Sequence, residues 1–314
     1  MNKFVKYIIC LLLLSCLLYF SVLMGGVLLH GYYNRIPNLR TYTGDLSHSL
    51  IRFKQADTLY KTDILIVGSS KAYMGYNPEI FSKSGFRAFN MGSSNQTPFN
   101  TYFILEHYLP RLNPDLVIMD IFYETFDNHY LAEGTTDIIT NCKVTGWTAE
   151  MALKTMNMNV WNSFLMHCLK NVFFGMENDS QREFENISYY KNGFVENNTT
   201  RPADTAIYRP ALSYTIYDEQ MNYLEKTIRL CKERHVKIIL VTSPQSRYYV
   251  ENEKTRHTFH KRIKRIITKY LVDYYDFTNM NLDERTDFAD YHHLTPAGVE
   301  KYNNQVIKYI TRQH

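Results

Sequence analysis

Short apolar or aromatic runs alternate with longer segments of helical spacing between residues 61 and 314. The runs are four to eight residues long and mostly rich in β-branched or aromatic residues, which is typical of strands. They lie at residues 64–67, 87–90, 115–122, 236–242 and 273–277. The helical segments lie at residues 97–109, 218–234, 254–269 and 296–312. This alternation predicts an α/β domain with a doubly wound, flavodoxin-like parallel sheet of about five strands.

The first apolar run ends in a turn that could carry a catalytic side chain. Ile64 to Val67 are followed directly by Gly68-Ser69-Ser70. A glycine allows the chain to leave the strand sharply, and ligands of open α/β sheets bind at the carboxyl ends of the strands. Ser70 is therefore a candidate nucleophile. Gly-Ser-Ser turns also occur without any catalytic role, so Ser70 needs a base elsewhere in the chain.

A candidate base lies more than two hundred residues downstream, in the segment Asp290-Tyr-His-His293. A nucleophilic serine requires a base, and a histidine base requires a group that orients its ring and stabilises the imidazolium. A turn that places Asp290 three residues before His293 allows the carboxylate to reach the near ring nitrogen. Thr295 and Pro296 are typical of the cap and first residue of the helix that ends this turn.

Together these motifs resemble the SGNH (GDSL-type) hydrolase superfamily. They are the Gly-Ser-Ser turn after the first strand, Gly92 after the second strand and the Asp290-x-x-His293 pair. More narrowly, the chain is similar to the membrane-anchored branch with DltD-like and alginate-acetylation-like proteins. The resemblance implies that Ser70 is the nucleophile, His293 the base and Asp290 its orienting group. It also implies an oxyanion hole lined by the backbone N–H groups of Ser70 and Gly92.

One block of the superfamily pattern is absent. The asparagine expected after the third strand is missing, because that place reads Met119-Asp-Ile-Phe-Tyr-Glu124. Asn95, in a neighbouring loop, is our candidate for the missing oxyanion donor. The absence also supports an alternative from another class, a catalytically weak SGNH-like module that binds glycan or scaffolds a polysaccharide export or modification complex.

The N-terminal residues 1–30 are expected to form a membrane anchor. An apolar run extends from Tyr7 to Leu29 and is preceded by Lys3 and Lys6. About 20 apolar residues suffice to cross a bilayer, and basic residues favour the cytoplasmic side. We therefore expect a single-pass protein with a cytoplasmic N-terminus and an extracytoplasmic catalytic domain. A cleaved signal peptide and a lipoprotein lipidated at Cys16 are the alternatives.

The remaining chain divides into a linker and one domain. Residues 31–60 are expected to be a juxtamembrane linker that leads into a short helix, and residues 61–314 the SGNH-like catalytic domain. Within that domain, residues 124–215 do not follow the strand–helix alternation and exceed an ordinary connection. Because this insertion leaves the third strand at its carboxyl end, it is either a lid over the site or a surface excursion without a role in recognition.

Composition and motif spacing argue against nucleic acid and metal ions as binding partners. A net charge of +4 and the absence of RNA-binding or phosphate-binding motifs give no reason to expect nucleic acid as a partner. The histidines have no ligand-like neighbours at zinc spacing, so we expect no metal and no cofactor. The resemblance implies a serine acyl-transfer enzyme, an esterase or O-acetyltransferase, that acts on a cell-surface polysaccharide. It also implies a multispanning membrane O-acyltransferase as a partner.

Overall fold

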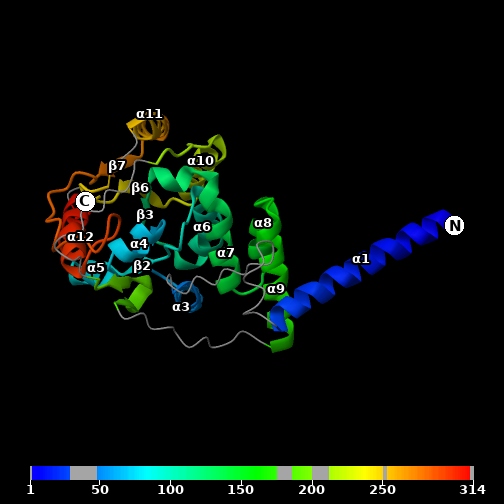
Figure 1. The fold of residues 1–314 in the computed structure, drawn as a ribbon. Helices are drawn as coiled ribbons and strands as arrows, with labels where there is room; N and C mark the ends of the chain where they lie inside the picture. Colours follow the sequence, from blue (N-terminus) through cyan, green and yellow to red (C-terminus); the bar gives the residue numbers. More distant parts are fainter. Residues whose placement is uncertain (1, 29–47, 175–185, 200–211, 250–252, 312–314) are drawn as a thin grey trace.

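The computed structural model describes residues 2–28, 48–174, 186–199, 212–249 and 253–311. Its centre is a sheet of five parallel strands in the order β2-β1-β3-β6-β7 (Figure 1). The strands are β1 (Ile64–Val67), β2 (Ala88–Asn90), β3 (Leu116–Asp120), β6 (Lys237–Thr242) and β7 (Asp273–Asp276). This is the flavodoxin-like order, so the predicted fold class is confirmed.

Helices cover both faces of the sheet, as buried parallel strands require. One face packs against α3 (Ser49–Ala56), α6 (Pro98–Leu112), α10 (Asp218–Glu233) and α11 (Glu253–Tyr270). The other face packs against α4 (Ser70–Gly75), α5 (Pro78–Lys83) and α12 (Pro296–Thr311). Successive residues of each strand enter opposite cores: Leu65 and Val67 contribute to the first, Ile64 and Ile66 to the second.

The order of the strands places the candidate site. The chain runs from β1 outward to β2 and then crosses to β3 on the other side of β1. In such sheets the carboxyl ends of the two strands at this reversal flank the ligand site. Here β1 leads into Ser70 and β3 ends at Asp120.

The boundaries of the domain differ from the prediction on the N-terminal side. Residues 29–47 of the expected linker lie outside the described residues. Helix α3, however, belongs to the main core, because Phe53 and Ala56 are buried there. The folded core therefore includes residues before residue 61.

The segment predicted as an insertion folds mostly as part of the domain. It contains two short 3-10 turns (η2, Tyr123–Phe126; η3, Asn128–Tyr130), α7 (Leu131–Asn141), α8 (Gly146–Lys154), α9 (Met158–Phe174) and the antiparallel hairpin of β4 (Ile187–Tyr189) and β5 (Val195–Asn197), joined by η4 (Lys191–Gly193). Ile138, Ile139 and Met151 are buried in the main core, and α7 and α8 contact α6. Helices α7 and α8 therefore pack beside α6, and the role of the segment as a lid stays a prediction.

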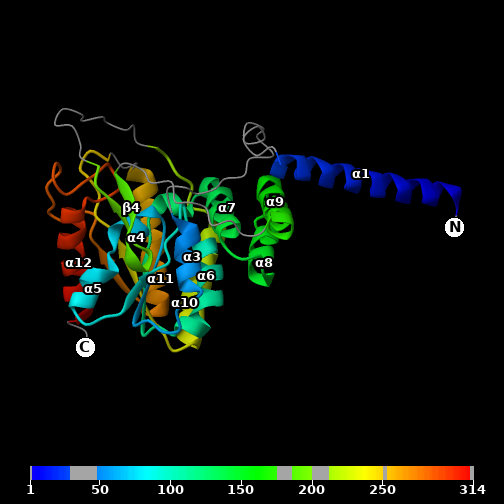
Figure 2. The same cartoon turned by 90° about the horizontal axis from the view of Figure 1, so that it is seen from below.

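Helix α1 (Lys3–Leu28) projects away from the sheet, and its C-terminal part contacts α9 (Figures 1 and 2). Its segment from Lys3 to Gly25 has a mean hydropathy of 2.6 and is almost entirely exposed. It is the one helix, among those described, that is long and apolar enough to cross a membrane.

Candidate active site

Ser70 and His293 meet at the carboxyl edge of the sheet. Ser70 is the first residue of α4, directly after the turn that leaves β1. His293 lies in the turn before α12, and its Nε2 is 2.9 Å from the Ser70 Oγ. Two segments separated by 223 residues therefore place a hydroxyl within hydrogen-bond distance of an imidazole. This is the geometry that a serine nucleophile needs from its base.

Asp290 holds the other side of the imidazole. Its Oδ2 is 2.7 Å from His293 Nδ1, and its Oδ1 accepts the backbone N–H groups of His292 and His293 at 2.7 and 2.8 Å. Burial raises the pKa of Asp290, but the charge of His293 and these hydrogen bonds outweigh it and hold the pKa well below its usual range. The ionised carboxylate keeps the proton on Nδ1 and leaves Nε2 to accept the serine proton.

The turn before Ser70 requires a glycine. Gly68 has a φ of +146°, which side-chain-bearing residues rarely adopt, and a Cβ there would lie 2.9 Å from both Cβ and O of Asp120. The nucleophile loop therefore passes directly over the end of β3.

The oxyanion donors expected from the resemblance include the backbone N–H of Gly92. Gly92 lies against α4, because a Cβ there would be 2.9 Å from the Tyr73 backbone nitrogen. Its N–H, however, donates to the Asn90 side-chain oxygen at 3.0 Å. The proton is accepted within the loop by Asn90, two residues earlier, and the role of Gly92 in an oxyanion hole stays a prediction. For the Gly92 N–H to bind an oxyanion, its hydrogen bond to the Asn90 side chain must first break.

Asn95, the second expected donor, lies in the loop before α6 with a positive φ of 47°. Its backbone oxygen would be 2.4 Å from a Cβ at Gly134, so the loop packs on α7. Nothing in the described part of the chain links its side chain to Ser70. Its role in an oxyanion hole stays a prediction.

A buried polar network behind the nucleophile turn was not found from the sequence. Asp120 is 5 % exposed, and its Oδ2 accepts hydrogen bonds from Ser243 Oγ and, at 3.0 Å, from Tyr76 OH. The hydroxyls of Tyr76 and Tyr302 lie 2.6 Å apart, while the second oxygen of Asp120 is buried without a hydrogen-bond partner. These residues come from four separate segments, so no spacing in the sequence could reveal the network.

We expect Asp120→Asn to change the pH dependence of stability. Burial raises the pKa of Asp120 to about 6, although Ser243, Lys71 and Tyr76 oppose this, and the unfolded value is about 3.9. Protonation of Asp120 therefore stabilises the fold fully below about pH 4, and this contribution is lost as the pH rises through about 6. The Tm of the wild type should fall relative to Asp120→Asn between these pH values.

Asp63→Asn is the matched control for this experiment. A hydrogen bond from Arg87 lowers the pKa of Asp63, against a smaller opposing effect of burial, so its stabilisation is present above about pH 4 and is lost on acidification. Its Tm difference from the wild type should therefore run in the opposite direction. Parallel Tm profiles for the wild type and Asp120→Asn would contradict the assignment.

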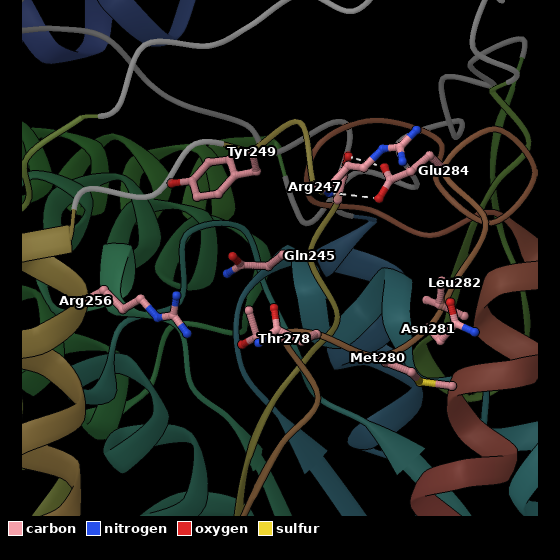
Figure 3. Close-up of a pocket in the computed structure, with 11 residues that line it drawn as sticks. Gln245, Arg247, Tyr249, Arg256, Thr278, Met280, Asn281, Leu282 and Glu284 are labelled. Carbon is pink, nitrogen blue, oxygen red and sulfur yellow. Dashed lines mark hydrogen bonds between the residues drawn. The ribbon is translucent and has the colours of Figure 1, made fainter.

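A polar cavity of about 580 Å³ lies beside the catalytic turn, at the carboxyl ends of β6 and β7 (Figure 3). It adjoins the turn because Ser246 N donates to Tyr291 O at 3.5 Å and the Tyr249 ring centroid lies 4.6 Å from that of His292. Its wall consists mostly of polar side chains, namely those of Gln245, Ser246, Arg247, Arg256, Thr278, Asn279, Asn281 and Glu284.

Gln245 is the residue of this cavity whose side chain would gain most from a hydrogen bond to a ligand. It is 9 % exposed, and its side-chain nitrogen is buried without a hydrogen-bond partner. In Figure 3 the amide points into the space bordered by Arg256 and Thr278. A buried N–H group without an acceptor is costly, so a ligand oxygen at this place would be stabilised.

Metal-binding clusters of three or more His, Cys, Asp or Glu side chains do not occur among the described residues. The site as described consists of a serine, a histidine and a carboxylate in one hydrogen-bonded chain.

Comparisons with known proteins were made for sequence and structure. A protein-family model matches residues 211–313, which is less than half of the chain. The search of curated sequences found no relative that matches this chain.

The chain is similar to several solved structures of lipases and esterases. An acetyl xylan esterase shares 12% identity over 80% of this chain and 99% of its own, with a TM-score of 0.43. A psychrotrophic esterase, EstA, from Pseudoalteromonas sp. shares 12% over 81% and 98%, with a TM-score of 0.43. A GDSL-like lipase from Bacteroides thetaiotaomicron shares 12% over 84% and 99%, with a TM-score of 0.41. At these values the likeness does not identify the substrate or the reaction of this chain.

Proposed function

We propose that this protein is an SGNH-type serine acyl-transfer enzyme, an O-acetyltransferase or esterase of the membrane-anchored branch. In this proposal it acts outside the cytoplasm on a cell-surface polysaccharide or glycan. The observation that carries the proposal is the chain of hydrogen bonds from Ser70 through His293 to Asp290, at 2.9 and 2.7 Å. The same three residues were singled out from the sequence alone.

The proposed reaction has two steps. His293 Nε2 accepts the Ser70 proton while Oγ attacks an ester carbonyl, and Asp290 stabilises the imidazolium that forms. The imidazolium then protonates the leaving alkoxide, and an acyl-serine remains. In the second step His293 takes a proton from water or from a sugar hydroxyl, which attacks the acyl-serine and regenerates Ser70. Water makes the enzyme an esterase, and a sugar hydroxyl makes it an acyltransferase.

The polar cavity supports a carbohydrate as the alcohol part of the substrate. A sugar offers many hydroxyl groups, and the wall of the cavity offers amide, guanidinium and hydroxyl groups rather than an apolar surface. Gln245 supplies a buried donor that a sugar oxygen would satisfy. The cavity lies next to the turn that carries His293, where the group bonded to the reacting carbonyl would lie.

Gln245→Leu is expected to raise KM for an acetylated oligosaccharide by about tenfold, because one buried hydrogen bond to the substrate is lost. The kcat for this substrate should change little. Steady-state kinetics with acetylated xylo-oligosaccharides measures both constants, and p-nitrophenyl acetate, which has no sugar, is the control whose KM should stay the same. Equal changes for the two substrates would argue against a sugar in this cavity.

The proposed function is tested by trapping the acyl-serine. The purified full chain is incubated with p-nitrophenyl acetate, the reaction is stopped with acid, and the peptide with Ser70 is analysed by mass spectrometry. We expect one acetyl group on Ser70, and transfer of acetyl to an added oligosaccharide if the enzyme is a transferase. An unmodified Ser70 in a folded protein that still hydrolyses the ester would refute the proposed nucleophile.

The second candidate is a catalytically weak module that binds glycan or scaffolds a polysaccharide export complex. One specific observation favours it, namely that the Gly92 N–H is already bonded to Asn90. Such a module would bind oligosaccharide with an affinity independent of Ser70, and the purified protein would neither form an acyl-serine nor hydrolyse esters.

The first proposal includes a multispanning membrane O-acyltransferase as the source of the acyl group. Co-purification from membranes tests this partner.

A further inference from the structure

Helix α9 lies against the apolar helix α1 at a depth that a membrane would occupy. In α1, Leu23 is completely buried and the Tyr19 hydroxyl donates a hydrogen bond to the Asn162 side chain of α9. Both residues of α1 fall inside the apolar segment from Lys3 to Gly25. The contact with α9 therefore involves residues within the apolar segment itself.

The length of α1 places this contact relative to the bilayer. About 20 helical residues cross the hydrocarbon core, so a span that begins after Lys6 ends at roughly residue 26. Tyr19 lies seven residues earlier, about 10 Å deeper at 1.5 Å per residue. If α1 spans a membrane, Asn162 of α9 lies below the surface of the leaflet on the domain side.

The exposed side chains of α9 and its flanks are suited to that environment. Met156 in the turn before α9 is 78 % exposed and Val172 near its end is 77 % exposed. Leu153, Met158 and Phe173 are also exposed. Between Met158 and Phe174 the sequence contains one charged residue, Lys170. Apolar side chains at both ends of a helix with almost no charge favour contact with acyl chains over water.

The orientation of α9 relative to α1 agrees with contact between α9 and lipid. In both overall views α9 runs across the direction of α1, and the sheet lies on the far side of α9 from the projecting part of α1 (Figures 1 and 2). A helix that crosses the direction of a membrane span runs along the bilayer more than through it. The polar groups of Asn162 and Ser163 are buried against the protein, so they do not face lipid.

We propose that α9, together with the turn before it, is an interfacial membrane helix whose exposed apolar side chains insert among the lipid acyl chains. This inference rests on the proposed role of α1 as a retained membrane anchor. The protein then has two membrane contacts, α1 across the bilayer and α9 within one leaflet. Two contacts restrict the rotation of the domain about α1 and hold the site of Ser70 in a constant orientation to the membrane.

The fluorescence of Trp161 can be used to test the proposal. The chain has two tryptophans, Trp147 and Trp161, and the second lies in α9. In Trp147→Phe the fluorescence of Trp161 reports on its surroundings alone. The full chain is reconstituted into phosphatidylcholine vesicles with and without brominated acyl chains, which quench nearby tryptophans. We expect Trp161 to be quenched to within about twofold of a tryptophan in the centre of the anchor.

The anchor reference is Leu12→Trp in a Trp147→Phe/Trp161→Phe background. Quenching of this reference without quenching of Trp161 would overturn the proposal for α9 while leaving the anchor intact. Absence of quenching in both would overturn the anchor itself. Labelling of Ser70 by a fluorophosphonate in the same vesicles is measured separately, so failure of the proposed catalytic function is distinguished from failure of either membrane contact.

A second variant tests the exposed side chains. Val172→Asp/Phe173→Asp should reduce the quenching of Trp161 at least about threefold, because charges in the leaflet are costly. The quenching of the Leu12→Trp reference should persist in the same background. Leu271→Asp is the matched control, since Leu271 is 88 % exposed but follows α11, remote from α1 (Figure 1). Equal effects of the two changes would overturn the assignment of α9.

Discussion

Ser70→Ala is expected to lower esterase turnover by at least about 10³-fold and to abolish labelling by a serine-reactive fluorophosphonate. The reason is that alanine removes the oxygen that forms the acyl-enzyme. The Ser70 hydroxyl contacts His293 Nε2, and we expect its loss to leave the backbone of β1 and α4 unchanged. The Tm should therefore stay within a few degrees of the wild type, which separates loss of chemistry from loss of folding. Turnover of p-nitrophenyl acetate, labelling and thermal unfolding are the three measurements.

His293→Ala should lower turnover to a similar extent, because residues that act as a unit are not additive when removed. The double variant with Ser70→Ala should be no worse than either single variant. Ser69→Ala is the matched control, since the Ser69 side chain makes no hydrogen bond that caps α4. It should retain turnover and labelling. Labelling that persists in Ser70→Ala and disappears in Ser69→Ala would assign the nucleophile to the neighbouring serine.

Gly298→Ala is expected to lower the free energy of unfolding by about 2–3 kcal/mol, although alanine ordinarily stabilises a helix relative to glycine. Gly298 lies in the first turn of α12, and a Cβ there would be 2.1 Å from the Asp287 carbonyl oxygen. That carbonyl is fixed by a hydrogen bond from Thr295, and Asp287 is completely buried and paired with Lys301 at 2.7 Å. The neighbour therefore cannot move away cheaply. Urea unfolding of the full chain measures the change.

The same substitution should also lower kcat, because Asp287 begins the turn that carries Asp290 and His293. Gly146→Ala is the matched control: Gly146 is also in the first turn of a helix, but a Cβ there meets no atom within 4 Å. It should be neutral or slightly stabilising and leave turnover unchanged. Destabilisation of equal size in the two variants would show that the contact with Asp287 is not the cause.

The features that could be predicted from the sequence are those that depend on residues close together in the chain. Four of the five strands are short runs whose side chains are mostly buried on two faces, and β7 is a short run that is only partly buried. Such short runs between helical segments make the position of each strand predictable to within about two residues. The strand expected at residues 115–122 is observed at Leu116–Asp120, and the one at 236–242 at Lys237–Thr242. The Asp290–His293 pair is local in the same sense, because both side chains and their shared hydrogen bonds lie in one turn.

The predictions that differ from the structure concern contacts between distant segments. The segment 124–215 was expected to be a lid or a surface excursion because it lacks the strand–helix alternation, yet α7 and α8 complete the core beside α6. Helix α3 was expected as a short helix at the end of a linker, yet Phe53 and Ala56 are buried in the main core. Amphipathic helices show which residues are buried but not against which element they pack, and that choice depends on the whole fold.

The sequence by itself determined the class of fold, the apolar N-terminal helix and the three side chains of the candidate catalytic chain, because period, composition and short spacing carry those signals. Only the tertiary structure decided that Ser70 and His293 meet at 2.9 Å. It alone brought Asp120, Tyr76 and Tyr302 into one buried network and placed α9 against Tyr19 of the apolar helix. The physical reason is that these contacts join residues tens to hundreds of positions apart, so they exist only once the sheet order and the helix packing are established.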